Sequence, residues 1–376
     1  MSLPSIEEIT EALGDVIDPE IKRPITELGM LRSVDIDDDG VVTVGIDLTT
    51  AGCPLRDTIT QDAQEVVGAL DGVTRVDVQM GVMNEEQKAE LRKTLRGGQA
   101  ERVIPFAQPG NLTRVYAVTS GKGGVGKSSM TVNLAASLAQ QGLSVGIVDA
   151  DIYGFSIPQM MGVDTPPQAV DNMIIPPISH GVKTISIGMF MQENGPVVWR
   201  GPMLHRALEQ FFADVFWGDL DVLLIDLPPG TGDVALSVAQ LIPTSEIVLV
   251  TTPQVAAADV AERAGMMAGQ TNQRVVGVIE NMSYLEMPDG TKMDIFGSGG
   301  GETVAAQLSG ILGYKVPLLG QVPLEQDLRE GGDSGIPFSG QEGNSPAQEA
   351  IRDIAKQLGT RARGLAGMSL GVAPVN

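Results

Sequence analysis

The sequence predicts an α/β protein in which a mostly parallel sheet is covered by helices on both faces, with a smaller α/β domain before it. Three observations support this fold. Short apolar segments alternate with helical patterns after residue 112, a glycine-rich loop follows the first of them, and a separate set of elements fills residues 1–95. Strands that alternate with helices form parallel sheets through right-handed crossovers, and strands covered on both faces are apolar almost throughout.

The smaller domain is predicted at residues 1–95, followed by a linker at 96–111. Apolar side chains recur at helical spacing in two places, and short alternating segments indicate strands. The linker is polar and charged, and then contains prolines and a glycine. The expected elements are a helix at 6–16, two strands around a turn at 37–40, a helix at 55–70 and a strand at 76–80.

The larger domain is predicted at residues 112–360, with a flexible tail at 361–376 that is rich in Arg, Gly and Ala. Ligands of parallel sheets bind at the carboxyl ends of the strands, so the chemistry is expected there. The expected strands are Val115–Thr119, Ser144–Asp149, Lys183–Gly188, Val222–Asp226, Ile247–Thr252, Val275–Glu280 and Leu318–Val322.

Residues 121–129 read Gly-Lys-Gly-Gly-Val-Gly-Lys-Ser-Ser, between a predicted strand and a predicted helix. This spacing is that of a phosphate-binding P-loop, in which glycines let successive backbone N–H groups point at phosphate oxygens. Lys127 would reach the β- and γ-phosphates, and the Ser128 hydroxyl would ligate Mg²⁺. The alternative is a flexible loop that matches by chance. The pattern predicts ATP binding by Gly121, Lys122, Gly123, Gly124, Val125, Gly126, Lys127, Ser128 and Ser129.

Acidic residues end two of the predicted strands. Asp149 and Asp151 follow the strand at 144–149, and Asp226 ends the strand at 222–226. Mg²⁺ prefers oxygen ligands and keeps several waters, so Asp226 is expected to hold it and Asp149 to support the ion or its water shell. Gly230 offers a backbone N–H for the γ-phosphate. For each acid taken alone, the alternative is a helix N-cap or a loop carboxylate; together, at the ends of these strands, the acids favour the magnesium site.

Composition narrows the function classes. The net charge of −22 argues against binding to nucleic acid or to anionic membranes, although acidity also serves solubility alone. One cysteine cannot form an intramolecular disulfide, which suits a reducing compartment. No signal peptide and no membrane-spanning apolar run are evident. The expectation is a cytoplasmic protein without stable membrane association.

The second lysine of the loop, Lys122, makes the segment resemble the signature of the dimeric ATPases related to MinD, ParA and nitrogenase iron protein. The resemblance implies a homodimer in which Lys122 reaches the partner's nucleotide; the alternative is a solvated surface lysine. It also implies that Asp151 activates the attacking water and that Asn281 reads adenine. A turn asparagine at a strand end is the other reading of Asn281. No glutamine is evident that would position the water, so slow ATP hydrolysis is expected.

Further segments resemble the Mrp (ApbC) family of ATP-dependent iron–sulfur cluster carriers. The N-terminal segments resemble a small domain found in several iron–sulfur assembly factors. Over nearly the whole chain the resemblance implies an ATPase that acts on iron–sulfur apoproteins or with assembly factors. The segments that carry it are Trp199–Met203, Asp226–Asp233, Glu280–Tyr284 and Ile295–Gly301, with Asp18–Glu20, Leu28–Met30 and Thr49–Pro54 in the small domain.

One departure from the family leaves cluster binding open. Family members that carry clusters have Cys-x-x-Cys just after the Asn-Met-Ser-Tyr segment, where this chain has Met287 and Gly290. Cys53 remains as a cluster-transfer or partner-contact residue, or as a small buried side chain. Without a cluster, the chain would be an ATP-dependent regulatory or partner-binding switch of the MinD/ParA type.

Overall fold

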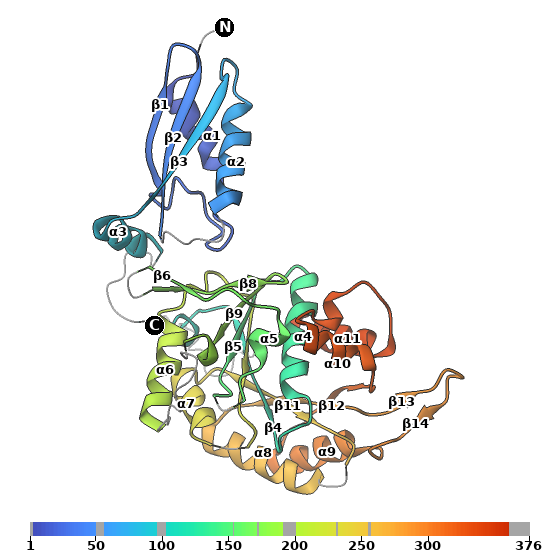
Figure 1. The fold of residues 1–376 in the computed structure, drawn as a ribbon. Helices are drawn as coiled ribbons and strands as arrows, with labels where there is room; N and C mark the ends of the chain where they lie inside the picture. Colours follow the sequence, from blue (N-terminus) through green and yellow to red (C-terminus); the bar gives the residue numbers. More distant parts are fainter. Residues whose placement is uncertain are drawn as a thin grey trace, which may run out of the picture. The chain divides into compact units, whose positions relative to one another are not determined.

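The structure is a computed structural model of the chain (Figure 1). The residues that it describes are 3–49, 56–95, 103–152, 154–170, 173–190, 201–230, 232–254 and 257–360. The chain divides into two compact units. The smaller unit comprises Met1–Arg102 together with two later segments, Pro167–Pro176 and Asp214–Gly218, and the larger unit comprises the rest. The domain boundaries predicted from the sequence stay a prediction.

The larger unit is built on a sheet that, within the described residues, has eight strands in the order β15-β12-β11-β4-β10-β5-β9-β8. Neighbouring strands are parallel except for β8 and β9. The predicted α/β fold with a mostly parallel sheet is confirmed, and the predicted strand ends match the observed ones or differ by at most two residues. The strands are β4 (Arg114–Ser120), β5 (Val145–Asp149), β8 (Ile178–Ser179), β9 (Val182–Ser186), β10 (Val222–Asp226), β11 (Glu246–Thr251), β12 (Val275–Asn281) and β15 (Leu318–Val322).

Helices cover both faces of this sheet (Figure 1). On one face α4 packs against α11, and on the other α6, α7, α8 and α9 pack in succession. Two shorter helices, α5 and α10, contact one another. The helices are α4 (Lys127–Gln140), α5 (Ile157–Met160), α6 (Gly201–Ala213), α7 (Asp233–Leu241), α8 (Ala257–Thr271), α9 (Gly300–Leu312), α10 (Gln326–Ser334) and α11 (Pro346–Thr360).

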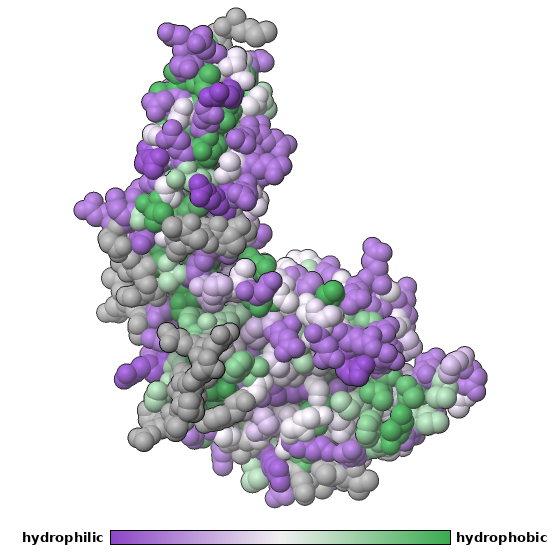
Figure 2. Space-filling view, viewed as in Figure 1, coloured by the Kyte–Doolittle hydropathy of each residue, from purple (hydrophilic) through white to green (hydrophobic). Residues whose placement is uncertain are grey.

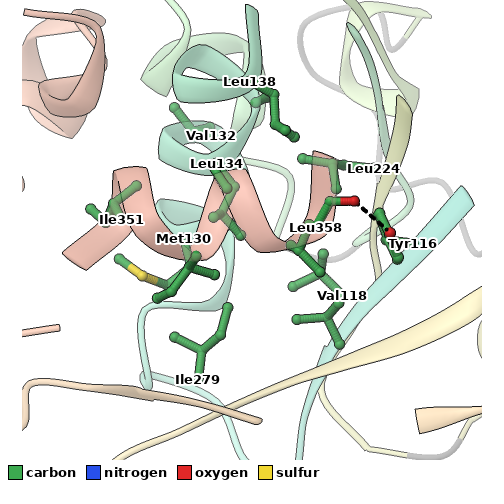
Figure 3. Packing of buried hydrophobic residues seen from close by; sticks show 14 of the residues in the cluster. Tyr116, Val118, Met130, Val132, Leu134, Leu138, Leu224, Ile279, Ile351 and Leu358 are labelled. Carbon is green, nitrogen blue, oxygen red and sulfur yellow. Dashed lines mark hydrogen bonds between the residues drawn. The ribbon is translucent and has the colours of Figure 1, made fainter. Parts of the chain in front are cut away.

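Apolar side chains from α4, α11 and the central strands form the main core of the larger unit (Figure 3). Met130, Leu134 and Leu138 recur at helical spacing on α4 and are fully buried between the sheet and α11. The Tyr116 hydroxyl donates a 2.9 Å hydrogen bond to the Leu358 carbonyl oxygen. A buried tyrosine hydroxyl needs such a partner, and this one ties β4 to the last described helix. The helix that begins at the glycine loop is therefore anchored along its length.

The smaller unit contains a three-stranded sheet in the order β1-β2-β3. β1 and β2 are antiparallel and joined by a tight turn, where Asp37 Oδ1 accepts from the N–H groups of Asp39 and Val41. β2 and β3 are parallel, and the helix between them provides the crossover connection that parallel strands need. The elements are α1 (Ile6–Ala12), β1 (Leu31–Ile36), β2 (Val41–Leu48), α2 (Arg56–Gly68), β3 (Arg75–Val82) and α3 (Glu85–Leu95), with β6 (Gln168–Val170) and β7 (Met173–Ile175) from the later segment.

A small hairpin, β13 (Leu285–Glu286) and β14 (Lys292–Met293), follows β12. Figure 2 shows hydrophilic residues over much of the visible face and hydrophobic residues gathered over this hairpin. Met293 and Ile295 are about half exposed there. None of the described helices combines the length and apolar character needed to cross a membrane.

Candidate functional site

The glycine loop runs from the end of β4 to the start of α4. Gly124 and Gly126 have positive φ angles of 78° and 81°, a conformation that a Cβ disfavours. Gly126 is also the N-cap of α4, and a Cβ on it would lie 2.2 Å from the amide nitrogen of Asn281. Side chains at these two positions would therefore distort the loop. The helix that begins directly after it directs its N–H groups and positive dipole end toward the loop, which favours anions.

Lys127, the first residue of α4, is buried in a network of polar side chains. Its Nζ lies 2.6 Å from Asp226 Oδ2 and 3.2 Å from Ser128 Oγ, and Ser128 Oγ donates to the same carboxylate oxygen at 2.6 Å. Asp226 is fully buried at the end of β10. A buried charge is tolerated when it is paired and hydrogen-bonded, as this carboxylate is. The network brings together the predicted phosphate lysine and two of the three residues predicted for Mg²⁺, Ser128 and Asp226.

Asp149 and Asp151 complete the acidic side of the site. Asp149 lies beside Asp226 in the parallel register of β5 and β10. One Asp149 oxygen accepts from Ser186 Oγ at 3.0 Å and from the Ile157 N–H at 3.3 Å, and the other accepts from the Asp151 N–H at 3.2 Å. The Asp151 carboxylate lies 3.6 Å from Lys127 Nζ and is slightly exposed. Asp149 is thus held rigidly, while Asp151 faces the lysine.

Burial shifts both acids toward their neutral forms. It raises the pKa of Asp149 to about 7, with repulsion from Asp226 adding to the rise and the Ser186 hydroxyl and backbone N–H groups opposing it. Burial also raises the pKa of Asp151, against the opposing effect of the Lys127 ammonium. A carboxylate with a raised pKa accepts a proton more readily, as a general base must.

The raised pKa of Asp149 predicts a pH-dependent stability. Between about pH 4 and 7 the folded state keeps a proton that the unfolded chain releases, so the free energy of unfolding should fall as the pH rises through that window. One proton contributes at most about 1.4 kcal/mol per pH unit. Denaturant unfolding of the nucleotide-free protein at pH 5, 6, 7 and 8 measures the slope. Asp149→Asn should remove this contribution, whereas parallel curves for the two proteins would contradict it.

The other lysine of the loop, Lys122, lies outside this network. Its Nζ lies 2.5 Å from Gln254 Oε1 in an exposed position. Its carbonyl oxygen accepts from Ser120 Oγ. The Gly230 N–H donates to the Ser120 carbonyl oxygen at 2.9 Å, and Gly230 has a positive φ of 92°. Lys122 is therefore free to leave an exposed hydrogen bond, which contributes little to stability.

Asn281 ends β12 and contacts the glycine loop directly. Its Nδ2 donates to the Val125 carbonyl oxygen at 2.9 Å. Within the described residues its Oδ1 is buried without a hydrogen-bond partner. Buried polar atoms are almost always paired, so this oxygen is an acceptor suited to a ligand.

Two further predicted residues of the loop accept hydrogen bonds through their carbonyl oxygens, and one predicted residue lies outside the described part. The carbonyl oxygen of Gly121 accepts from Arg263 Nη1 at 3.4 Å, and that of Ser129 accepts from Asn133 Nδ2 at 2.8 Å. Cys53 lies outside the described residues. Sequence reasoning missed Gln254, Ser186 and Thr131, a fully buried residue whose hydroxyl reaches Asp226 Oδ1 at 2.8 Å. None of the three belongs to a motif, so the sequence offered no signal for them.

The donors fit Mg²⁺ as a nucleotide-bound ion. The Ser128 hydroxyl and the Asp226 carboxylate are hard oxygen donors, and a Mg²⁺ site of one or two protein oxygens is completed by phosphates and water. In the part of the chain that the structure describes, no three His, Cys, Asp or Glu side chains gather to hold a metal ion by themselves. The two oxygen donors, Ser128 and Asp226, suit a metal that is also held by a phosphate ligand.

Comparison with known proteins agrees with this geometry. Residues 111–359, well over half of the chain, match the ParA family, described as NUBPL iron-transfer P-loop NTPase. The chain belongs to this family. Residues 6–78 in addition match a family described as iron–sulfur cluster assembly protein. The family assignment confirms the predicted P-loop NTPase fold and the predicted resemblance to iron–sulfur carriers of the MinD/ParA type.

Relatives within the family are similar to this chain along nearly their whole length. The iron–sulfur cluster carrier protein of Mycobacterium tuberculosis strain H37Rv is 62% identical over 97% of this chain and 96% of its own. The protein of the same name from Bacillus subtilis strain 168 is 42% identical over 94% of this chain and 97% of its own.

A solved structure supports the fold of the larger unit. A nucleotide-binding protein from Archaeoglobus fulgidus, in complex with ADP and with cobalt, is 36% identical with a TM-score of 0.52. The similarity covers 61% of this chain and 89% of that one. The NTPase fold thus occurs in a related protein that holds a nucleotide.

Proposed function

We propose that this protein is an ATP-hydrolysing iron–sulfur cluster carrier that acts as a homodimer in the cytoplasm and delivers clusters to apoproteins. The observation that carries the ATPase part is the buried network of Lys127, Ser128 and Asp226 directly behind the glycine loop. The cargo is inferred from the relatives. They are named iron–sulfur cluster carrier proteins, and they match this chain over almost all of their length. Those names favour a carrier over a regulatory switch without a cluster.

Each residue of the site has a separate role in ATP hydrolysis. When ATP binds, Lys127 leaves the Asp226 carboxylate and contacts the phosphates. Its positive charge there offsets the negative charge that develops during phosphoryl transfer. Ser128 and Asp226 would hold Mg²⁺, which would supply positive charge to offset the negative charge of the phosphates. Asp151, slightly exposed and 3.6 Å from Lys127, orients and deprotonates the attacking water. Asp149 keeps the strand end rigid. The Gly230 N–H, which in this structure donates to the Ser120 carbonyl oxygen, exchanges that oxygen for the γ-phosphate and so senses it.

We infer that Asn281 recognises the adenine base of the nucleotide. Because its Nδ2 is held by the Val125 carbonyl, its Oδ1 remains as an acceptor, which suits the exocyclic amine of adenine. Guanine has a carbonyl oxygen where adenine has this amine. That oxygen and Asn281 Oδ1 are both hydrogen-bond acceptors, so they repel each other. The site is therefore expected to prefer ATP to GTP.

The cargo step depends on thiolates, and Cys53 is the only cysteine in the sequence. A homodimer supplies two thiolates, whereas a four-iron cluster takes four ligands, so the remaining ligands would come from an apoprotein or an assembly factor. We infer that the dimer holds a cluster through its two Cys53 thiolates and leaves the other ligand positions open to the protein that receives the cluster.

The carrier role predicts that iron binding depends on Cys53. After anaerobic incubation with iron and sulfide and removal of excess reagents, the wild-type protein should retain iron and visible absorbance, and Cys53→Ala should fall to background. Iron content by colorimetric assay and the absorbance spectrum measure this. No iron on the wild-type protein, together with a Cys53→Ala variant that behaves identically in cells, would overturn the carrier role.

The β13–β14 hairpin offers a matched gain-of-function variant. Met287 and Gly290 are the first and last residues of its turn, where the Gly290 N–H donates to the Met287 carbonyl oxygen at 2.8 Å. Two cysteines there would lie close enough to share a metal, although the φ of 81° at Gly290 makes cysteine strained at that position. Met287→Cys with Gly290→Cys should raise bound iron to about four per dimer. Unchanged iron content would show that the hairpins of two subunits do not meet.

A further inference from the structure

Thr131 lies on the inner side of α4, one turn after Lys127. It is fully buried, and its Oγ1 lies 2.8 Å from Asp226 Oδ1 and 3.0 Å from the Lys127 carbonyl oxygen. The phosphate-binding motif ends before it, so the motif assigns it no role. Its hydroxyl nevertheless touches the carboxylate on which the magnesium site depends.

The hydroxyl has a single proton to donate, and two acceptors compete for it. A threonine in a helix often donates to the carbonyl oxygen four residues back, which would be a purely local contact. Here that carbonyl is neutral and already accepts the helical N–H of Thr131. The Asp226 oxygen is the closer of the two acceptors. Its carboxylate is paired with the Lys127 ammonium at 2.6 Å and is closed off from water, with its side chain 1% exposed. Hydrogen bonds to charged acceptors are about twice as strong as neutral ones, so the proton points to Asp226.

The two oxygens of Asp226 therefore have different partners. Oδ2 accepts from Lys127 and Ser128, which are the residues that turn to the nucleotide and its metal. Oδ1 accepts from Thr131. When ATP and Mg²⁺ bind, Lys127 and Ser128 leave Asp226 Oδ2 and turn to the nucleotide and the metal. Of these three side chains, Thr131 is then the one that continues to hold the Asp226 carboxylate.

We propose that Thr131 is a positioning residue that fixes the plane of the Asp226 carboxylate, so that Oδ2 keeps its aim toward the magnesium–nucleotide complex. The inference rests on the proposed ATPase function and deepens it. A hydroxyl that holds the far oxygen of a metal-binding carboxylate typically contributes a factor of about 10 to 100 in metal affinity.

The test compares Thr131→Val, which keeps the shape and removes the hydroxyl, with Thr131→Ser, which keeps the hydroxyl. Two quantities are measured for each: the Mg²⁺ concentration that half-saturates binding of a non-hydrolysable ATP analogue, and the affinity for the same analogue in EDTA. Thr131→Val should raise the half-saturating Mg²⁺ concentration about 10- to 100-fold. Its affinity in EDTA should stay within about twofold of wild type, and Thr131→Ser should restore the Mg²⁺ dependence.

Thr271→Val is the matched control. Thr271 on α8 donates at 2.8 Å to the carbonyl oxygen of Met267, four residues back, as Thr131 would if its contact were only local. The control should leave the Mg²⁺ dependence unchanged. If Thr131→Val does not fold, Thr131→Ala removes the same hydroxyl without the branched methyl groups, and the same measurements apply.

An unchanged Mg²⁺ dependence in Thr131→Val or Thr131→Ala, or a Thr131→Ser variant that behaves like Thr131→Val, would overturn the inference. Because the measurement is of binding, it remains decisive even if the wild-type protein proves not to hydrolyse ATP. That result would instead contradict the proposed function.

Discussion

Lys127→Ala and Asp151→Asn should both abolish ATP hydrolysis, yet only the first should weaken ATP binding. Lys127 supplies a buried positive charge to the phosphates, and losing a charged hydrogen bond of about 1.5–3 kcal/mol lowers affinity about 10- to 100-fold. Asp151 is an acid 3.6 Å from that lysine, so removing its charge leaves the attraction between Lys127 and the phosphates intact. Each substitution should reduce the rate of phosphate release at least about 100-fold.

Equilibrium binding of a fluorescent ATP analogue and phosphate release measure the two effects separately. Lys356→Ala is the control, because it removes an exposed lysine from α11, a helix that holds none of the candidate site residues. It should change neither quantity. Equal loss of binding in Lys127→Ala and Asp151→Asn would remove the role assigned to Asp151 as the base.

A mixture of Lys122→Ala and Asp151→Asn proteins should regain activity that neither has alone. In a mixed dimer one site keeps its own Asp151 and receives an intact Lys122 from the neighbour. Random exchange of equal amounts makes half of the dimers mixed, each with one working site, so activity should reach about a quarter of wild type. Among the described residues, the Lys122 ammonium has an exposed hydrogen bond to Gln254, and breaking such a contact opposes its move to the partner only weakly.

Mixing Lys127→Ala with Asp151→Asn is the matched negative control, because both residues act within their own subunit and each site of the mixed dimer lacks one of them. Phosphate release is followed after exchange, with heterodimer formation checked by differently tagged subunits. If heterodimers form and the first mixture stays inactive, Lys122 acts within its own subunit or not at all.

The residues whose adjacency could be predicted from the sequence are those whose positions follow from a rule of the fold. Asp149 and Asp226 end two parallel strands, and such ends lie at one edge of the sheet, so their adjacency in β5 and β10 could be predicted. Lys127 and Ser128 open a helix after a glycine loop, which fixes their direction toward that edge. The apolar runs predicted the strands for the same kind of reason.

Contacts that depend on the packing of separate segments could not be predicted. Gln254 meets Lys122 across 132 residues of sequence, and nothing in the local pattern around either residue indicates the pairing. The Thr131 hydroxyl also lies near the Lys127 carbonyl oxygen in its own helix, which is the contact expected of a helical threonine. Nothing in the sequence therefore indicates its contact with Asp226. The segments Pro167–Pro176 and Asp214–Gly218 look like parts of the larger domain in sequence order, yet they cluster with the smaller unit.

ATP-dependent transfer of a cluster tests the carrier function most directly. The wild-type protein, loaded anaerobically with iron and sulfide and separated from free reagents, is mixed with an apoenzyme that needs a four-iron cluster, with and without Mg²⁺-ATP. Recovery of the apoenzyme's activity is followed over time against Lys127→Ala loaded in the same way. Faster recovery with ATP, for the wild-type protein and not for Lys127→Ala, is the predicted result. Recovery that is absent, or equally fast for both proteins with and without ATP, would contradict an ATP-driven carrier.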